Sequence, residues 1–231
     1  MTKVKFSALI SEMRGKLNGS VFTKNRYGNA LRNKVTPVNR RTSYQQAIKQ
    51  RFTFYSQKWR SLTPAQVNAW NASTEDFKSS NVFGDSIRPT GSNLYCALNA
   101  NLALIGGVEL TDPPLQKNIE GVKSFGLTVN SQPGSEKFSI DFNPSPTNAD
   151  VDHLILATRC YSPGKSYVQG QYRMIGIISG GTASAYDALH EWQNKFGVLV
   201  GGQMVSVKLV PVHRVTGCKS KAGNELASKV L

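Results

Sequence analysis

Residues 19–42 read GSVFTKNRYGNALRNKVTPVNRRT. Two β-prone runs, 20–26 and 30–35, flank Tyr27-Gly28-Asn29, where glycine and asparagine tolerate the positive φ of a tight turn. The pattern predicts a β-hairpin with a three-residue connection, although a one-residue shift would mix its two faces. In the predicted register one face carries Phe22, Lys24, Arg26, Ala30, Arg32 and Lys34, and the other carries Val21, Thr23, Asn25, Leu31, Asn33 and Val35.

Positive charge is concentrated in and around this hairpin. Residues 1–60 carry 14 Lys or Arg and a single acid, Glu12, so they hold +13 of the chain's net charge of +14. Like charges across two strands are unfavourable unless something anionic covers them. We therefore expect a surface that binds a partner protein or phosphate, formed by Lys16, Lys24, Arg26, Arg32, Lys34, Arg40, Arg41, Lys49 and Arg51.

A helical module is predicted after the hairpin. Thr42 or Ser43 can cap a helix with Gln45 or Gln46 near its third position. Thr63-Pro64 is a second helix start, and a third helix is expected from about Ser92 to Gly106-Gly107. The first two helices would form an αα-hairpin. Apolar residues recur at helical spacing in the first helix, at Tyr44, Ala47, Ile48, Phe52, Tyr55, Trp59 and Leu62.

The aromatic residues of the first helix have two interpretations. Interleaved with cations, they could stack on the bases of a single-stranded nucleic acid. We favour the other interpretation, in which Phe52, Tyr55 and Trp59 share one buried stripe. The two helices also suggest a helix-turn-helix, but the second one, AQVNAWNAS, has no Lys or Arg to read DNA bases.

The last half of the chain has a β-rich pattern. Short runs punctuated by Gly, Pro, Asn and Asp predict a β-sandwich of immunoglobulin or fibronectin type, with one helix at 184–196. The predicted class is α+β: a basic β-hairpin arm at 1–41, a small helical module at 42–110 and an immunoglobulin-like sandwich at 120–231. The expected strands lie at 122–130, 137–143, 152–160, 172–179, 203–213 and 224–230.

The sequence contains no complete motif of a catalytic or metal-binding site. Gly164-Lys165-Ser166 resembles the end of a phosphate-binding loop, but Arg159 stands where that loop needs a glycine. We interpret the histidines, at 153, 190 and 213, as ordinary surface or strand-end residues because none has a metal-ligand neighbour at a typical spacing. The acid pairs Glu75-Asp76 and Asp150/Asp152 are interpreted as solvated. We predict no catalytic residue, metal site or cofactor, and no enzymatic activity.

Membrane insertion and disulfide bonding are not expected either. No run of 18 apolar residues exists, and the apolar stretch Phe6–Ile10 is too short for a signal peptide. Cys96, Cys160 and Cys218 are odd in number and widely spaced, which is typical of reduced thiols in a protein made in the cytoplasm.

The segment from Met13 to Asn71 resembles the N-terminal module of a family of tailed-bacteriophage virion proteins. This family occurs among phages of Bacteroidota, crAss-like phages included. The shared features, in order, are RGKLNG, VFTKNR, KVTPVN, QQAIKQRF and WRSLTPAQVNAW. The similarity covers residues 10–75 and continues weakly to about residue 105. The chain departs from the family at Tyr27-Gly28-Asn29, where two glycines usually precede an aromatic residue, and at Arg40, where proline is usual.

The resemblance implies a structural component of a phage particle, made in the host cytoplasm and present in many copies. An auxiliary or decoration capsid protein, or a head–tail component, would dock through its basic arm on other virion subunits such as the major capsid, portal or ring proteins. Two alternatives remain open: an arm that contacts packaged DNA without reading its sequence, and a nucleic-acid-binding regulator.

Overall fold

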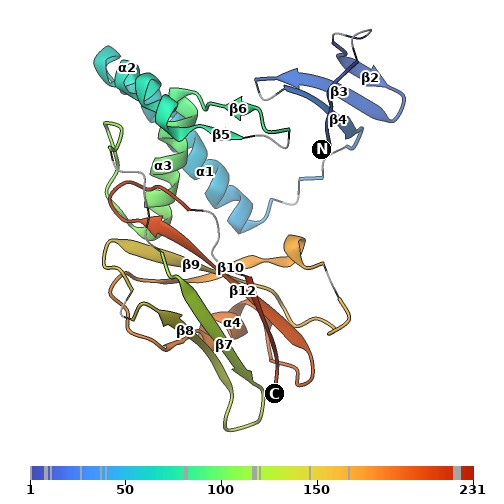
Figure 1. The fold of residues 1–231 in the computed structure, drawn as a ribbon, viewed down its shortest axis with the longest axis vertical. Coiled ribbons are helices and arrows are strands. Elements are labelled where there is room, and N and C mark those ends of the chain that lie inside the picture. The colour runs from blue at the N-terminus through green and yellow to red at the C-terminus, as the bar shows by residue number, and fades with distance from the viewer. Residues whose placement is uncertain are drawn as a thin grey trace. The chain divides into compact units, whose positions relative to one another are not determined.

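The protein is a mixed α+β chain with antiparallel sheets, which confirms the predicted class (Figure 1). The computed structural model describes residues 2–7, 10, 12–26, 28–36, 38–39, 41–80, 83–115, 119, 121–145, 147–165, 167–220 and 225–231. The chain folds into two compact units. The first unit comprises Met1–Cys96 and Thr111–Pro113, and the second comprises Ala97–Leu110 and Pro114–Leu231.

The predicted hairpin lies at the centre of a larger sheet. Its strands are β3 (Ser20–Asn25) and β4 (Gly28–Asn33), and the sheet order is β1-β4-β3-β2. The outer strands are β1 (Thr2–Lys3) and β2 (Gly15–Leu17). Sequence periodicity missed both outer strands because two or three residues are too few to show the alternation of a strand.

The predicted register of the hairpin is wrong: Lys24, expected opposite Arg32, pairs with Asn29, a shift of three residues. Asn25 pairs directly with Gly28, so the connection is the two-residue loop 26–27, of which Tyr27 lies outside the described residues. Gly28, at φ 96°, begins β4 instead of lying inside the loop. Phe22 therefore faces Leu31, and the two predicted faces are mixed because side chains alternate along each strand.

The helices that follow the hairpin begin and end close to where the sequence placed them. Thr42 caps the first helix and Thr63 caps the second, each in a capping box with the glutamine three residues later. The elements are α1 (Ser43–Lys58), the 3₁₀ turn Trp59–Ser61, α2 (Pro64–Ser73), the 3₁₀ turn Thr74–Phe77, the short strands β5 (Ser79–Ser80) and β6 (Ser86–Ile87), and α3 (Gly91–Ile105).

An aromatic cluster forms the core of these helices. Tyr95 of α3 contacts Tyr55 and Trp59 from the end of α1 and Trp70 of α2, with ring centroids 5.4–6.3 Å apart. The indole N–H of Trp70 donates to the Thr111 carbonyl at 2.8 Å, which satisfies the one polar atom of this fully buried side chain. The cluster holds the C-terminal end of α1.

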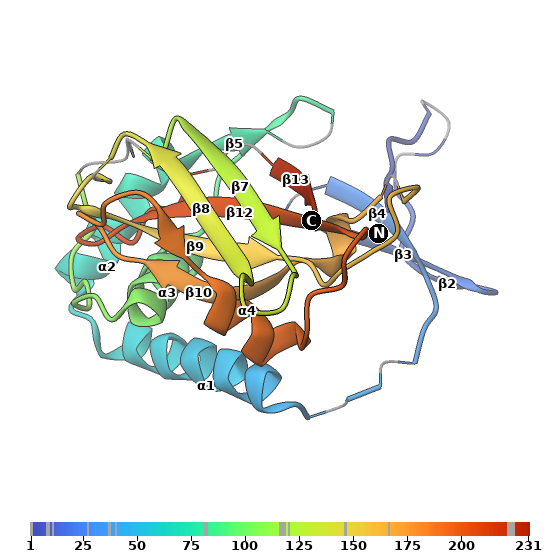
Figure 2. The ribbon, with the colours of Figure 1, turned by 90° about the horizontal axis from the view of Figure 1, so that it is seen from below.

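The second unit contains two antiparallel sheets that share one core. Figure 2 shows β7 and β8 lying across the sheet that contains β9 and β12. The sheet orders are β10-β9-β12-β13 and β11-β8-β7. The elements are β7 (Ser124–Asn130), β8 (Lys137–Asn143), β9 (Val151–Ala157), the 3₁₀ turn Gln169–Gln171, β10 (Arg173–Ile178), β11 (Tyr186–Asp187), α4 (Leu189–Phe196), β12 (Met204–His213) and β13 (Glu225–Lys229).

Alternating side chains of these strands build the core. Phe138 and Ile140 of β8 meet Ile155 of β9 and Val207 of β12, and all four are buried. Trp192 of α4 lies in the same core and stacks on Phe138 at 5.9 Å. The helix expected at 184–196 is shorter than predicted, since residues 186–187 pair with β8 as a strand. Helical spacing alone could not reveal so short a pairing.

The C-terminal half of α3 is fastened to the loop that follows β12. Asn101 donates a hydrogen bond to the Gly217 carbonyl at 2.8 Å. Gly217 has φ +66°, and a Cβ atom there would lie 2.4 Å from the Leu98 carbonyl oxygen. Only glycine lets the loop come this close to the helix. The close approach and the Asn101 hydrogen bond together attach this part of α3 to the second unit.

Candidate functional site

The first unit has a long segment without negative charge. From Met13 to Thr74 the sequence contains twelve Lys or Arg and no Asp or Glu. The acids at its two boundaries each bind two cations: Glu12 pairs with Arg14 and Lys24, and Glu75 pairs with Lys78 and Arg88. Arg14 and Lys24 of the segment are thus paired with Glu12, and the segment itself supplies no acid for its other cations. This segment is the candidate partner-binding surface.

The N-terminal sheet brings two of the predicted site residues together. Val21 of β3 lies between Lys16 of β2 and Arg32 of β4 in the same cross-strand row. Residues paired across strands point to the same face, so the two cations flank Val21 on one side of the sheet, and both are exposed. Two neighbouring positive side chains on a small sheet attract an anionic group, whether a carboxylate or a phosphate.

Lys24 lies on the opposite face, against the prediction, and is engaged within the chain. It is paired with Asn29 in the hairpin, and its ammonium group donates to Glu12 at 2.7 Å. Hydrogen bonding to Lys24 is the main reason why the pKa of Glu12 is lowered, with Arg14 adding to the effect. Glu12 thus stays ionised at neutral pH and offsets part of the charge of Lys24.

The other predicted residues lie outside the strands. Arg26 is in the hairpin loop, Lys34 follows β4 and Arg41 directly precedes the cap of α1, and all three are exposed. Arg40 lies outside the described residues. In α1, Lys49 is exposed and Arg51 is half-buried. The predicted cations therefore form no single cluster among the described residues; they are distributed over the sheet, the link and the helix.

Sequence reasoning missed an exposed apolar surface on α1. Tyr55 is buried as predicted, with 7% exposed, but Phe52 is 58% exposed and Ile48 is 45% exposed. Val38 in the preceding link, 82% exposed, lines a groove with Ile48 and Lys49. The apolar face of α1 extends beyond the part that contacts the aromatic cluster around Tyr95. The available signal was the low apolar content of the next helix, AQVNAWNAS, whose large apolar residues are Val67 and Trp70 alone.

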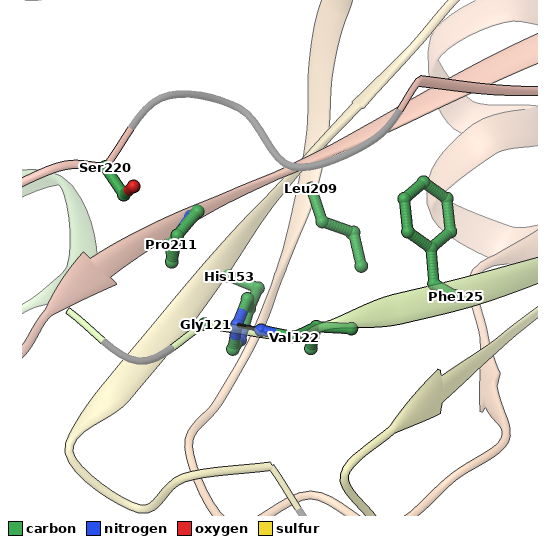
Figure 3. Close-up of a pocket in the computed structure, with 7 residues that line it drawn as sticks. All are labelled: Gly121, Val122, Phe125, His153, Leu209, Pro211 and Ser220. Atoms are coloured by element: carbon green, nitrogen blue, oxygen red, sulfur yellow. Dashed lines mark hydrogen bonds between the residues drawn. The ribbon is translucent and has the colours of Figure 1, made fainter.

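His153 is one of the residues that line a small cavity in the second unit (Figure 3). The cavity measures about 110 Å³ and is lined by Val122, Leu209 and Pro211 among others. His153 is 1% exposed, and its Nε2 accepts from the Val122 amide at 3.2 Å. Burial lowers the pKa of His153, so the ring is neutral. The cavity has room for a few water molecules, and we assign it a packing role.

The imidazole of His153 is thus buried in strand β9, where a surface or strand-end residue was predicted. Among the described residues its Nδ1 has no hydrogen-bond partner. His213 does end β12, as expected, and its Nδ1 accepts from the Val215 and Thr216 amides at 3.2 Å. His190 is exposed. In the part of the chain that the structure describes, no three His, Cys, Asp or Glu side chains form a group that could hold a metal ion.

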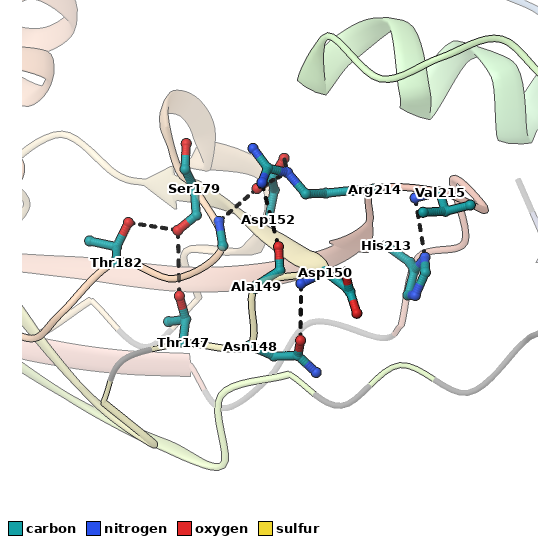
Figure 4. Close-up of polar contacts among 11 residues, drawn as sticks. Thr147, Asn148, Ala149, Asp150, Asp152, Ser179, Thr182, His213, Arg214 and Val215 are labelled. Atoms are coloured by element: carbon teal, nitrogen blue, oxygen red, sulfur yellow. Dashed lines mark hydrogen bonds and ion pairs between the residues drawn. The ribbon is translucent and has the colours of Figure 1, made fainter.

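A polar network joins the loops at one end of the second unit (Figure 4). Asp152, expected to be solvated, is only 2% exposed. Its carboxylate accepts from the Gly180 amide at 2.8 Å and from Nε of Arg214 at 3.2 Å. Arg214 also donates to the Ala149 carbonyl at 3.4 Å. These hydrogen bonds pair buried polar groups with one another and connect the loops. We therefore assign the network a role in stabilising the fold and no role in binding or catalysis.

The three cysteines, Cys96, Cys160 and Cys218, are free thiols. No helix among the described residues combines the length and apolar character that crossing a bilayer requires. Comparison of the sequence with protein-family models and with curated proteins finds no match.

Proposed function

We propose that the protein is a non-enzymatic structural component of a bacteriophage particle that docks on other virion subunits through its basic N-terminal region. The observation that carries the proposal is the segment Met13–Thr74, with twelve cations and no acid. Lys16, Arg32, Lys34 and Arg41 in it are exposed. Such a surface is stabilised when an acidic neighbour covers it. The resemblance of residues 10–75 to phage virion proteins supplies the context.

Two features support docking on protein. The N-terminal sheet has two edges, β1 and β2, at which a strand of a neighbour can add. The exposed apolar side chains of α1 offer surface that only a macromolecular partner can bury. Complementary charge would accelerate docking and fix its orientation. An auxiliary or decoration capsid protein, or a head–tail component, fits this behaviour.

We further propose that residues 120–231 are an immunoglobulin-like sandwich that serves the particle as a spacer or decoration. Two antiparallel sheets around one core support a sandwich. The spacing of the short strands supports the immunoglobulin type. Solution of the assembled particle's structure tests both parts.

The central test uses particles. Mass spectrometry of purified phage should find the chain in many copies per particle. Two variants of equal net charge then locate the docking surface. The N-terminal quadruple variant carries Lys16→Gln, Arg32→Gln, Lys34→Gln and Arg41→Gln, and the C-terminal quadruple variant carries Lys123→Gln, Lys137→Gln, Lys165→Gln and Arg173→Gln, all at exposed positions.

Particles assembled with the N-terminal quadruple variant should retain fewer copies of the chain than wild-type particles, and the loss should grow with salt. The C-terminal quadruple variant should be retained like the wild type. A chain that is absent from purified particles contradicts the proposed function. Equal retention of both variants would show that docking does not use the basic surface.

A second candidate function is contact with packaged DNA, or regulation through nucleic acid, without base recognition. The pair Lys16 and Arg32 favours it, because two exposed cations in one row can contact successive phosphates. Filter binding of duplex DNA across a salt series tests it. DNA binding predicts an affinity that falls steeply with salt and a slope lower by about four in the N-terminal quadruple variant. Absence of binding removes this function.

A further inference from the structure

Helix α1 uses one half of its apolar face inside the first unit and exposes the other half. Tyr44, Ile48 and Phe52, spaced four residues apart, form what we call the α1 stripe, and each is 45–58% exposed. The same face continues into Tyr55 and Trp59, which contact Tyr95 of α3. The exposed half is therefore continuous with a packed helix interface.

The α1 stripe also forms one wall of a groove. Val38 and Asn39 of the link before α1 line this groove together with Gln45, Ile48 and Lys49. Its apolar side chains are Val38 and Ile48, which are 82% and 45% exposed. A concave apolar surface beside a helix is the shape that receives a second amphipathic helix.

Charge decides which kind of helix fits. Lys49 and Arg51 lie on the two sides of the stripe, at 100° per residue around the helix axis. Helix α1 contains no acid, and no acid occurs between Glu12 and Glu75. A basic or neutral occupant would leave these charges uncompensated, whereas flanking Asp or Glu on the occupant would pair with them.

Other occupants fit less well. A second copy of the chain would bring another net charge of +14 to the same surface, which repels. A nucleic acid would neutralise Lys49 and Arg51 but leave the aliphatic side chains of Val38 and Ile48 in water. A membrane surface favours a broad apolar face with lysines along the polar side, but half of this face is already packed and the polar side is rich in glutamine.

We propose that the α1 stripe and its groove bind an acidic amphipathic helix of another protein. Apolar residues of that helix at i, i+4 spacing would cover Val38, Ile48 and Phe52, and its flanking carboxylates would pair with Lys49 and Arg51. The inference rests on the proposed function in one respect: it takes the helix to belong to a neighbouring subunit of the particle.

The probe is a synthetic peptide of about 18 residues, long enough for five helical turns, with Leu in an i, i+3, i+4, i+7 stripe flanked by Glu. A scrambled peptide of the same composition is its control. Titration of the full chain into labelled peptide, followed by fluorescence anisotropy, measures the affinity. We expect the amphipathic peptide to bind at least about tenfold more tightly than the scrambled one.

Variants of the chain then locate the peptide. Ile48→Ser with Phe52→Ser should weaken binding about tenfold or more, since it removes the apolar contacts. Val198→Ser with Val215→Ser, which are exposed valines of the second unit, is the matched control and should leave affinity unchanged. Lys49→Glu should weaken binding severalfold, and Lys123→Glu should not. The thermal midpoint of Ile48→Ser with Phe52→Ser should equal that of the wild type.

Several results would overturn the inference. Equal affinity for the scrambled peptide means general attraction of polyanions, and no binding of either peptide removes the site. A further result is that vesicles of phosphatidylcholine and phosphatidylserine capture the wild type but not the double variant Ile48→Ser with Phe52→Ser, which we call the stripe variant. That result would show that the α1 stripe binds a membrane surface and not a helix. A lowered thermal midpoint in the stripe variant means that the chain itself covers the stripe.

The inference and the proposed function fail separately. A chain found in purified particles that does not bind the peptide loses only the α1 site. A chain that binds the peptide through the α1 stripe but is absent from particles keeps the site and loses the proposed function.

Discussion

Asp152 and His153 are neighbours in β9 that lie buried for different reasons. Side chains alternate along a strand, so His153 points into the core between the two sheets while Asp152 points the other way, toward Arg214. Isolated histidines and paired acids are surface residues in most sequences, which is how we interpreted them. Burial of both residues depends on strands and loops that are distant in the sequence, and no local pattern shows it.

Burial of His153 predicts a pH dependence of stability. The folded-state pKa of His153 is lowered by burial, and the nearby Asp152 only partly opposes this. Between the folded and the ordinary pKa of about 6.5, the unfolded chain binds more protons than the folded one. The free energy of unfolding should therefore fall as pH drops below about 6.5.

The measurement is urea unfolding between pH 8 and pH 5.5. His153→Gln should abolish this part of the pH dependence, because glutamine does not titrate. His190→Gln, at an exposed position, should retain it. If His153→Gln and the wild type lose stability in parallel, the ring of His153 is not the group responsible.

The carboxylate of Asp152 should contribute to stability. Asp152→Asn removes the charge that accepts from Gly180 and Arg214, and hydrogen bonds to charged groups contribute about 1.5–3 kcal/mol each. Because Arg214 is half exposed and regains water, we expect the free energy of unfolding to fall by about 2 kcal/mol. Asp150→Asn, an exposed neighbour, should change it by less than about 0.5 kcal/mol. Equal effects of the two substitutions in urea unfolding would contradict the assignment.

At the scale of elements, helices were predicted better than strand pairing. Capping boxes at Thr42 and Thr63 are local, because the capping side chain bonds to backbone three residues away. The hairpin register depends on whether Gly28 lies inside the turn or begins the second strand. The same sequence is compatible with a two-residue and with a three-residue loop. The edge strands β1 and β2 become strands only by pairing with the hairpin.

Engineered disulfides distinguish the two registers. Lys24→Cys with Asn29→Cys places cysteines directly opposite each other, and this pair should oxidise readily. Lys24→Cys with Arg32→Cys, opposite in the three-residue-loop register, should remain reduced because the two residues lie on different faces. Peptide mapping by mass spectrometry reads both outcomes. A crosslink between residues 24 and 32 alone would restore the register expected from the sequence.

At the scale of the whole molecule, the position of the charge matters more than its amount. Residues 1–60 carry +13 of the net charge of +14, and residues 61–231 carry only +1. Binding to a charged surface depends on the local density of charge within about 10 Å, which is the Debye length at 0.1 M salt. Charge in the first unit should therefore dominate any electrostatic association of the chain.

Cation-exchange chromatography tests this with the two quadruple variants. Each loses four charges, so both fall from +14 to +10. The N-terminal quadruple variant should elute at clearly lower salt than the C-terminal quadruple variant, although their net charges are equal. Elution of the two variants at the same salt concentration would show that the chain is retained by its total charge.

The sequence by itself determined the α+β class, the helix starts at Thr42 and Thr63, the β-rich second half and the basic N-terminal segment. These depend on composition and on contacts within a few residues. The tertiary structure decided which faces are covered: the burial of Asp152, the mixed hairpin faces and the exposure of Ile48 and Phe52 on α1. A side chain is buried only where a second element meets it, and periodicity describes one element at a time.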